Sequence, residues 1–171
     1  MCCARRWTLS ATRHAVMLHE DHMSQTPDDK TLYRISGSFN RQSAMTTIGA
    51  RLKEVGPGRV VIELPMADHV LQQNSFVNGG VIGMIADSAC GYAALTMFGP
   101  EKAVLTTEYK IHFLSPAIGD RFEAEGRVVR SGRSISVVQG DVYAYKGEQK
   151  KHVAVMLATM MSVEKTPGMV D

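Results

Sequence analysis

Several features that mark whole classes of protein are scarce in this sequence. Only three of its 171 residues are cysteine, and two of those are adjacent near the N-terminus, so neither a disulfide framework nor a zinc site is indicated. The net charge is only +2, and no basic run interleaved with aromatic residues is present, which argues against a nucleic-acid partner. With so few cysteines, we expect a reducing, cytoplasmic setting.

The sequence also lacks a convincing membrane span. Its longest apolar run, residues 78–97, approaches the length needed to cross a bilayer, but Asp87 lies near its middle and glycine and alanine are abundant. We therefore expect no membrane partner. Hydrophobic residues make up 44% of the chain and charged residues 21%, values ordinary for a single domain that buries its own core.

The first 30 residues differ from the rest of the chain. They begin with a basic stretch, no acidic residue precedes Glu20, and no continuous apolar segment of the kind found in secretory signals follows. We interpret residues 1–30 as a disordered extension. An organelle-targeting peptide and a natural start at Met23 remain alternatives. The domain is expected over residues 31–165, with a short tail at residues 166–171.

The apolar run at residues 78–97 is the centre of the predicted fold. Gly79 and Gly80 open it and Gly99 and Pro100 follow it, which favours a helix over a strand. Apolar residues occupy nearly every side of this helix, and that pattern is typical of a buried one. Its many small residues would let other backbones approach closely.

Asp87 is the one formal charge in that helix. Burying an unpaired carboxylate costs several kcal/mol, so we expect Asp87 to be paired, to line a wet cleft, or to have a shifted pKa. Gly79 lies eight residues earlier, at the helix start, where free N–H groups attract negative charge. These residues alone fit either a chemical site or a structural acid bonded to a neighbouring strand or subunit.

The segment before the helix is predicted to hold one short helix and one hairpin. The ordered part is expected to begin near Leu32, with a short helix at residues 39–46. Apolar and polar residues then alternate at residues 48–53 and again at 59–64, on either side of a glycine-proline turn. This period of two predicts a pair of antiparallel strands.

The segment after the helix keeps the same period of two. In the first of these strands, strict alternation puts Thr106 and Tyr109 on opposite faces. Short turns join the strands, which predicts an antiparallel meander and, with the helix, an α+β domain. The four strands are expected at residues 103–113, 122–130, 135–143 and 153–161.

Three stretches of sequence, taken in order, resemble the PaaI-like branch of the hotdog-fold acyl-CoA thioesterases. They are residues 72–94, 106–117 and 129–134, and the whole resemblance covers residues 39–163. It implies a curved antiparallel sheet wrapped around one long central helix, assembled as a homodimer or homotetramer. It also implies that an acyl-CoA thioester is hydrolysed to free acid and coenzyme A without a metal or other cofactor.

The resemblance carries a catalytic set over to this chain. In related enzymes the first glycine of a His-Gly-Gly sequence polarises the thioester carbonyl through its N–H, and Gly79 holds that position. The acidic residue eight positions on, matching Asp87, acts as nucleophile or general base across the cleft between subunits. Gln72 matches an amide that contacts the reacting end in some members, and Thr106 matches a hydroxyl that holds the water or the carboxylate.

The substrate-binding residues implied by the resemblance include one departure. Asn78 stands where the family most often has histidine, and it can form hydrogen bonds at a helix start but cannot titrate. An alternative is therefore a non-catalytic acyl-CoA-binding or sensor protein on the same fold. A hydratase ranks lower, because the Asp and His spacing of that family is absent. The other expected substrate-binding residues are Gly80, and Arg130, Gly132 and Arg133, which are candidates for the nucleotide end of coenzyme A.

Two further side chains with reactive groups receive plain structural interpretations. Cys90, inside the predicted helix, is expected to be a small buried hydrophobic residue. His152 is expected to be an exposed strand residue.

Overall fold

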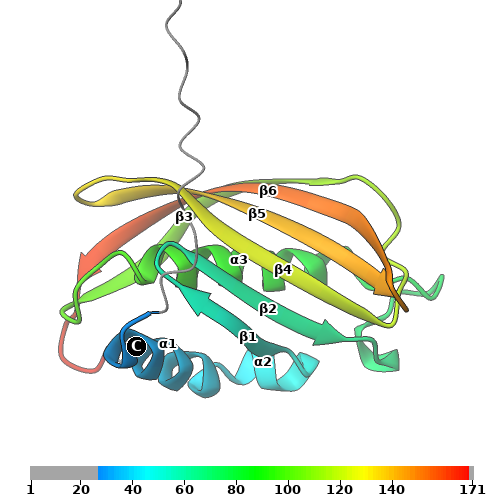
Figure 1. The fold of residues 1–171 in the computed structure, drawn as a ribbon, viewed down its shortest axis with the longest axis horizontal. Helices are drawn as coiled ribbons and strands as arrows, with labels where there is room; N and C mark the ends of the chain where they lie inside the picture. The colour runs from blue at the N-terminus through cyan, green and yellow to red at the C-terminus, as the bar shows by residue number, and fades with distance from the viewer. Residues whose placement is uncertain (1–26, 170–171) are drawn as a thin grey trace, which may run out of the picture.

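The protein is described by a computed structural model that covers residues 27–169 (Figure 1). Most of the extension expected at residues 1–30 therefore lies outside the described residues. Within the described part, six strands form one antiparallel sheet in the order β1-β2-β4-β5-β6-β3. The strands are β1 (Arg51–Gly56), β2 (Arg59–Pro65), β3 (Lys102–Phe113), β4 (Arg121–Ser131), β5 (Ile135–Lys146) and β6 (Gln149–Glu164).

The sheet curves around one long helix, α3 (Gly79–Leu95), as Figure 1 shows. Two shorter helices, α1 (Asp29–Arg41) and α2 (Ser43–Ile48), precede the sheet, and a 3-10 turn, η1 (Asp68–Val70), lies between β2 and α3. The predicted α+β class and the curved sheet around a central helix are both confirmed.

Helix α1 begins at Asp29, three residues before the expected start of ordered structure near Leu32. The carboxylate of Asp28 accepts a hydrogen bond from the Thr31 N–H at 2.6 Å, the usual role of an aspartate that caps a helix N-terminus. The helix then buries Phe39, whose ring centroid lies 5.8 Å from that of Tyr92 in α3. This contact fixes α1 against the central helix.

The short helix predicted at residues 39–46 and the strand predicted at residues 48–53 are both wrong in their bounds. Residues 39–46 divide between α1 and α2, because Gln42 has an extended backbone. Helix α2 runs on to Ile48 and ends at Gly49, whose φ of 75° is the left-handed conformation typical of a glycine after a helix. Strand β1 therefore starts only at Arg51.

Helix α3 lies very close to the sheet, and glycines on two strands make this possible. A Cβ atom added to Gly126 of β4 would lie 2.3 Å from the carbonyl oxygen of Ala89, and one added to Gly140 of β5 would lie 2.8 Å from the Cys90 sulfur. The expected close backbone approach is thus confirmed. Cys90 is fully buried, and burial raises the pKa of its thiol, as expected for a small hydrophobic residue.

Strand β3 contains a β-bulge that the sequence pattern does not reveal. Thr106 and Glu108 pair with consecutive residues of β6, so Thr107 is an extra residue on β3. The bulge exchanges the two faces of the strand along the rest of its length. Thr106 and Tyr109 consequently both face α3, and the prediction that they lie on opposite faces is wrong.

Candidate active site

The start of helix α3 presents one unused backbone donor. The side-chain oxygen of Asn78 accepts a hydrogen bond from the Gly80 N–H at 2.8 Å, and the carbonyl of Asn78 accepts from Val81 and Ile82 at 3.0 and 3.1 Å. Among the hydrogen bonds of residues 27–169, none uses the Gly79 N–H. Because the positive end of the helix dipole lies here as well, this N–H is suited to an oxyanion.

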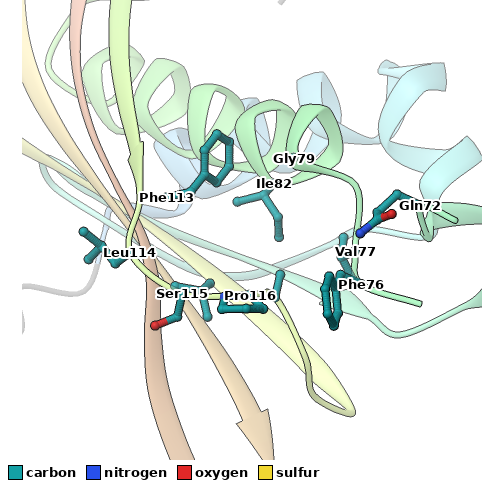
Figure 2. A pocket seen from close by; sticks show the side chains of 11 residues that line it. Gln72, Phe76, Val77, Gly79, Ile82, Phe113, Leu114, Ser115 and Pro116 are labelled. Carbon is teal, nitrogen blue, oxygen red and sulfur yellow. The ribbon is translucent and has the colours of Figure 1, made fainter. Parts of the chain in front are cut away.

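A pocket of about 410 Å³ opens beside this N–H (Figure 2). It brings together two of the residues singled out from the sequence, Gly79 and Gln72. The side-chain oxygen of Gln72 accepts a hydrogen bond from the Asn74 N–H at 2.8 Å, which orients the amide. The other lining residues are Phe76, Val77, Ile82, Phe113, Leu114, Ser115, Pro116, Ala117 and Val153.

The structure also brings together Asp87 and Thr106. The Thr106 hydroxyl donates a hydrogen bond of 2.8 Å to Oδ1 of Asp87. Asp87 is half-buried, and burial raises the pKa of its carboxyl above the ordinary value, while the hydrogen bond from Thr106 acts in the opposite direction. A carboxylate with a raised pKa is a better base near neutral pH than one in water.

The two pairs of residues are well separated within one chain. Gly79 and Asp87 are eight residues apart on one helix, which corresponds to about 12 Å along the helix axis. Groups that act on the same reacting atom must lie within about 3 to 3.5 Å of it. One chain therefore does not bring Gly79 and Asp87 to a common thioester-sized group.

The expected nucleotide-binding residues lie at the Asp87 end of this arrangement. Arg130, Gly132 and Arg133 are exposed and belong to the hairpin between β4 and β5. Ile135, where β5 begins, and Leu105 of β3 pair with the same residue of β6. The sheet register thus places the hairpin at the same end of the sheet as Thr106, with β6 between β5 and β3, and away from the pocket at Gly79.

Two aromatic residues of β3 contact this region and were not singled out from the sequence. The ring of Phe113 lies against Gly79, with its nearest atom 3.2 Å from where a Cβ atom on Gly79 would be. The Tyr109 hydroxyl lies 4.0 Å from the corresponding position on Gly83. Two glycines four residues apart on one side of the helix, Gly79 and Gly83, were the sequence signal that bulky side chains could pack there. No feature of the sequence indicated the bulge that turns Phe113 and Tyr109 toward them.

His152 differs from its interpretation as an exposed residue. It is half-buried, its Nε2 lies 3.0 Å from Oδ1 of Asp141, and its ring stacks on Tyr143 with centroids 4.8 Å apart. Val142 and Val153, the neighbours of these residues along their strands, are buried in the core. Because side chains alternate along a strand, Asp141, Tyr143 and His152 lie on the face of the sheet away from α3. His152 therefore takes no part in the candidate site.

The described residues also bear on two other kinds of site. Within residues 27–169, no three side chains of His, Cys, Asp or Glu gather as they would around a metal ion. In the same part of the chain, no helix combines the length and apolar character that crossing a membrane requires.

Comparison with known proteins finds matches that are named as thioesterases or esterases. The family model described as the thioesterase superfamily matches residues 74–151. A protein of Saccharolobus solfataricus named "Putative esterase" is 37% identical over 82 residues, which cover 48% of this chain and 58% of that protein.

Solved structures match over more of the chain. A thioesterase family protein from Silicibacter pomeroyi is 38% identical, with a TM-score of 0.77, and the match covers 79% of this chain and 99% of that one. The Escherichia coli PaaI protein from the phenylacetic acid degradation operon has a TM-score of 0.74 at 20% identity, covering 82% and 99% of the two chains. This second likeness shows the fold. The chain therefore belongs to the thioesterase superfamily and has the hotdog fold.

Proposed function

We propose that the protein hydrolyses an acyl-CoA thioester to a free carboxylic acid and coenzyme A. The observation that carries the proposal is the Asp87 carboxyl, half-buried in an apolar helix, with a raised pKa and a hydrogen bond from Thr106. Such a carboxylate can remove a proton from water or attack the thioester itself as a nucleophile.

The Gly79 N–H supplies the second requirement of the reaction. When water or the carboxylate adds to the thioester carbonyl carbon, negative charge develops on the carbonyl oxygen. A fixed backbone donor at a helix start stabilises that charge, and loss of one such donor costs about 3–4 kcal/mol in other enzymes. Gln72 lines the same pocket and lies where its amide can contact the reacting end. The intermediate then expels the thiolate of coenzyme A. Where Asp87 is the nucleophile, this step leaves an acyl–Asp87 anhydride, which water hydrolyses to the free acid.

A second copy of the chain completes the site in this proposal. Strand β3 is the last strand of the sheet, and its free edge has no partner among the described residues. Large apolar side chains on and beside it are about half exposed, namely Leu105, Tyr109, Phe113 and Leu114. Unpaired edges and exposed apolar surface of this kind favour association with another copy.

Pairing two copies of β3 would also bring Gly79 of one chain close to Asp87 of the other. If the two strands run antiparallel about a two-fold axis, the Phe113 end of one lies beside the Thr106 end of the other. Gly79 of one chain then faces Asp87 of its partner. The exposed Arg130 and Arg133 of the partner lie near the mouth of the same site, where they can bind the phosphates of coenzyme A.

The test is release of free thiol from a panel of acyl-CoAs by the wild-type protein and by Asp87→Asn. We expect turnover by the wild type and a loss of about 10²- to 10⁴-fold in Asp87→Asn, since asparagine keeps the shape but not the base. Asp29→Asn, a change at an exposed residue of α1, serves as the matched control.

Two results would contradict this function. Undiminished turnover by Asp87→Asn would remove the carboxyl from the mechanism. Tight binding of acyl-CoA by the wild type without any thiol release would favour the acyl-CoA-binding alternative, which Asn78 motivates because its side chain caps α3 and cannot carry a proton.

A further inference from the structure

We propose that Phe113 is the residue that determines which acyl groups the site accepts, because its ring closes the pocket on the side of Gly79. This inference rests on the proposed thioesterase function and assigns a role to a residue outside the set suggested by family resemblance. It further holds that the accepted acyl groups are uncharged and apolar.

The position of the Phe113 ring is the first observation. Three atoms at the far end of the ring, Cζ, Cε1 and Cε2, lie 3.2, 3.5 and 3.7 Å from where a Cβ atom on Gly79 would be. The tip of the ring therefore rests on the first residue of α3, directly beside the proposed oxyanion donor. Figure 2 shows the ring above Ile82, on the Gly79 side of the pocket.

The bulge in β3 explains how Phe113 reaches this place. If Thr107 took its place in regular alternation rather than forming a bulge, His112 would face α3 and Phe113 would face away from it. Because of the bulge, Thr106, which bonds Asp87, and Phe113, which lines the pocket, both face α3.

The chemistry of the pocket lining is the second observation. Eight of the eleven lining residues are apolar, Gln72 and Ser115 are the polar ones, and Gly79 contributes backbone. None of the lining residues is charged. An acyl group with its own carboxylate would lose its hydration there without gaining a cationic partner, which is costly. Apolar acyl groups enter without that cost.

Exposure distinguishes Phe113 from the walls of the pocket that belong to the core. Val77, Ile82 and Val153 are at most 4% exposed and belong to the core, so they cannot move aside without disturbing the fold. Phe113 is 56% exposed. Among the walls that touch the start of α3, it is the one whose size can change with little loss of packing within its own chain, and it also belongs to the apolar edge that we propose meets the second copy.

The test compares Phe113→Ala and Phe113→Trp with the wild type on straight-chain acyl-CoAs from acetyl-CoA to palmitoyl-CoA. Phe113→Ala lengthens the pocket, so we expect the ratio of kcat/KM for long over short chains to rise by about tenfold or more. Phe113→Trp is expected to lower that ratio. Leu157→Ala, on the neighbouring strand β6, similarly exposed and outside both the pocket lining and the proposed interface, is the matched control and should leave the ratio unchanged.

Binding separates failure of this inference from failure of the proposed function. Calorimetry gives Kd for the same acyl-CoAs, with Asp87→Asn as the background so that no ligand is consumed. If the wild type releases no thiol, the hydrolase proposal fails, and a shift of the tightest-binding chain length in Phe113→Ala still supports the present inference. An unchanged chain-length preference in both rates and Kd values would overturn it, as would the absence of both turnover and binding.

Protein quality is controlled in the same experiment. Melting curves of each variant establish folding, and Phe113→Leu provides a smaller apolar side chain if Phe113→Ala is unstable. A preference for a dicarboxylic acyl-CoA, such as succinyl-CoA, over its uncharged analogue would overturn the assignment of an apolar acyl group.

Discussion

The Thr106 hydroxyl donates a 2.8 Å hydrogen bond to Oδ1 of Asp87, joining the edge strand of the sheet to the middle of the buried helix. Two opposing effects meet in this carboxyl. Burial raises its pKa, and the hydrogen bond from Thr106, which stabilises the ionised form, lowers it. The net result is a pKa above the ordinary value for aspartate.

Replacing Thr106 with valine should move the pH dependence of activity. Valine keeps the branched shape but cannot donate, so burial acts alone and the Asp87 pKa rises further. A base must be ionised, and the acid limb of the kcat/KM profile should therefore shift to higher pH. Thr107→Val is the control, because the Thr107 hydroxyl bonds the Thr159 carbonyl instead. An acid limb that stays in place would exclude Asp87 as the titrating base.

Asp87→Asn should change stability in a pH-dependent way. Since the pKa of Asp87 is raised by folding, its contribution to stability is fully present below the ordinary aspartate pKa of 3.8 and is lost as pH rises through the folded pKa. Asparagine does not titrate. Urea unfolding at several pH values should show Asp87→Asn gaining stability relative to the wild type between acid and neutral pH. A difference that does not vary with pH would contradict the raised pKa.

Gly79→Pro removes the proposed oxyanion donor while preserving the helix. Proline is well tolerated at the first position of a helix, and Asn78, with φ −58° and ψ 135°, already has the conformation favoured before proline. We expect kcat to fall by about 10²- to 10³-fold with little change in melting temperature.

Gly79→Ala is the steric control for that variant. It keeps the N–H but adds a Cβ atom that would lie 3.2 Å from the Phe113 ring, so the ring must shift slightly. Its loss of activity should be clearly smaller than that of Gly79→Pro. Equal activity in the two variants would show that the N–H has no catalytic part.

Gly126→Ala should strongly destabilise the fold. The new Cβ atom would lie 2.3 Å from the Ala89 carbonyl oxygen and 2.6 Å from the Cys90 nitrogen, both backbone atoms that cannot move independently. We expect a cost of about 3 kcal/mol or more, measured by chemical denaturation. Gly91→Ala adds the same atom on α3 where nothing lies within 4 Å, and should be neutral or slightly stabilising. Similar stabilities of the two variants would contradict the close packing of α3 against the sheet.

Much of the fold could be predicted from local patterns. The buried helix over residues 78–97 is marked by its apolar run and flanking glycines, and the structure places α3 at Gly79–Leu95. The strands after it follow from a period of two. The fold class and the central helix can therefore be predicted from hydrophobic periodicity and turn residues alone.

What escaped prediction depended on contacts distant in sequence. The bulge at Thr107 exists because β3 pairs with β6 in a particular register, and no local sequence feature of the strand indicates it. The end of α2 at Gly49 was signalled only by a glycine that also fits a strand. As a result, strict alternation puts Phe113 on the wrong face of β3. The family resemblance names both Thr106 and Asp87, which the structure joins by a hydrogen bond.

The central claim is that Gly79 and Asp87 of different chains form one active site, and mixed dimers test it most directly. Asp87→Asn and Gly79→Pro chains with different affinity tags are co-expressed, and dimers carrying both tags are purified. One of the two sites in such a dimer then has both wild-type groups and the other has neither. We predict that each parent variant is nearly inactive and that the mixed dimer recovers about half of the wild-type activity. A mixed dimer as inactive as its parents would contradict a site shared between chains.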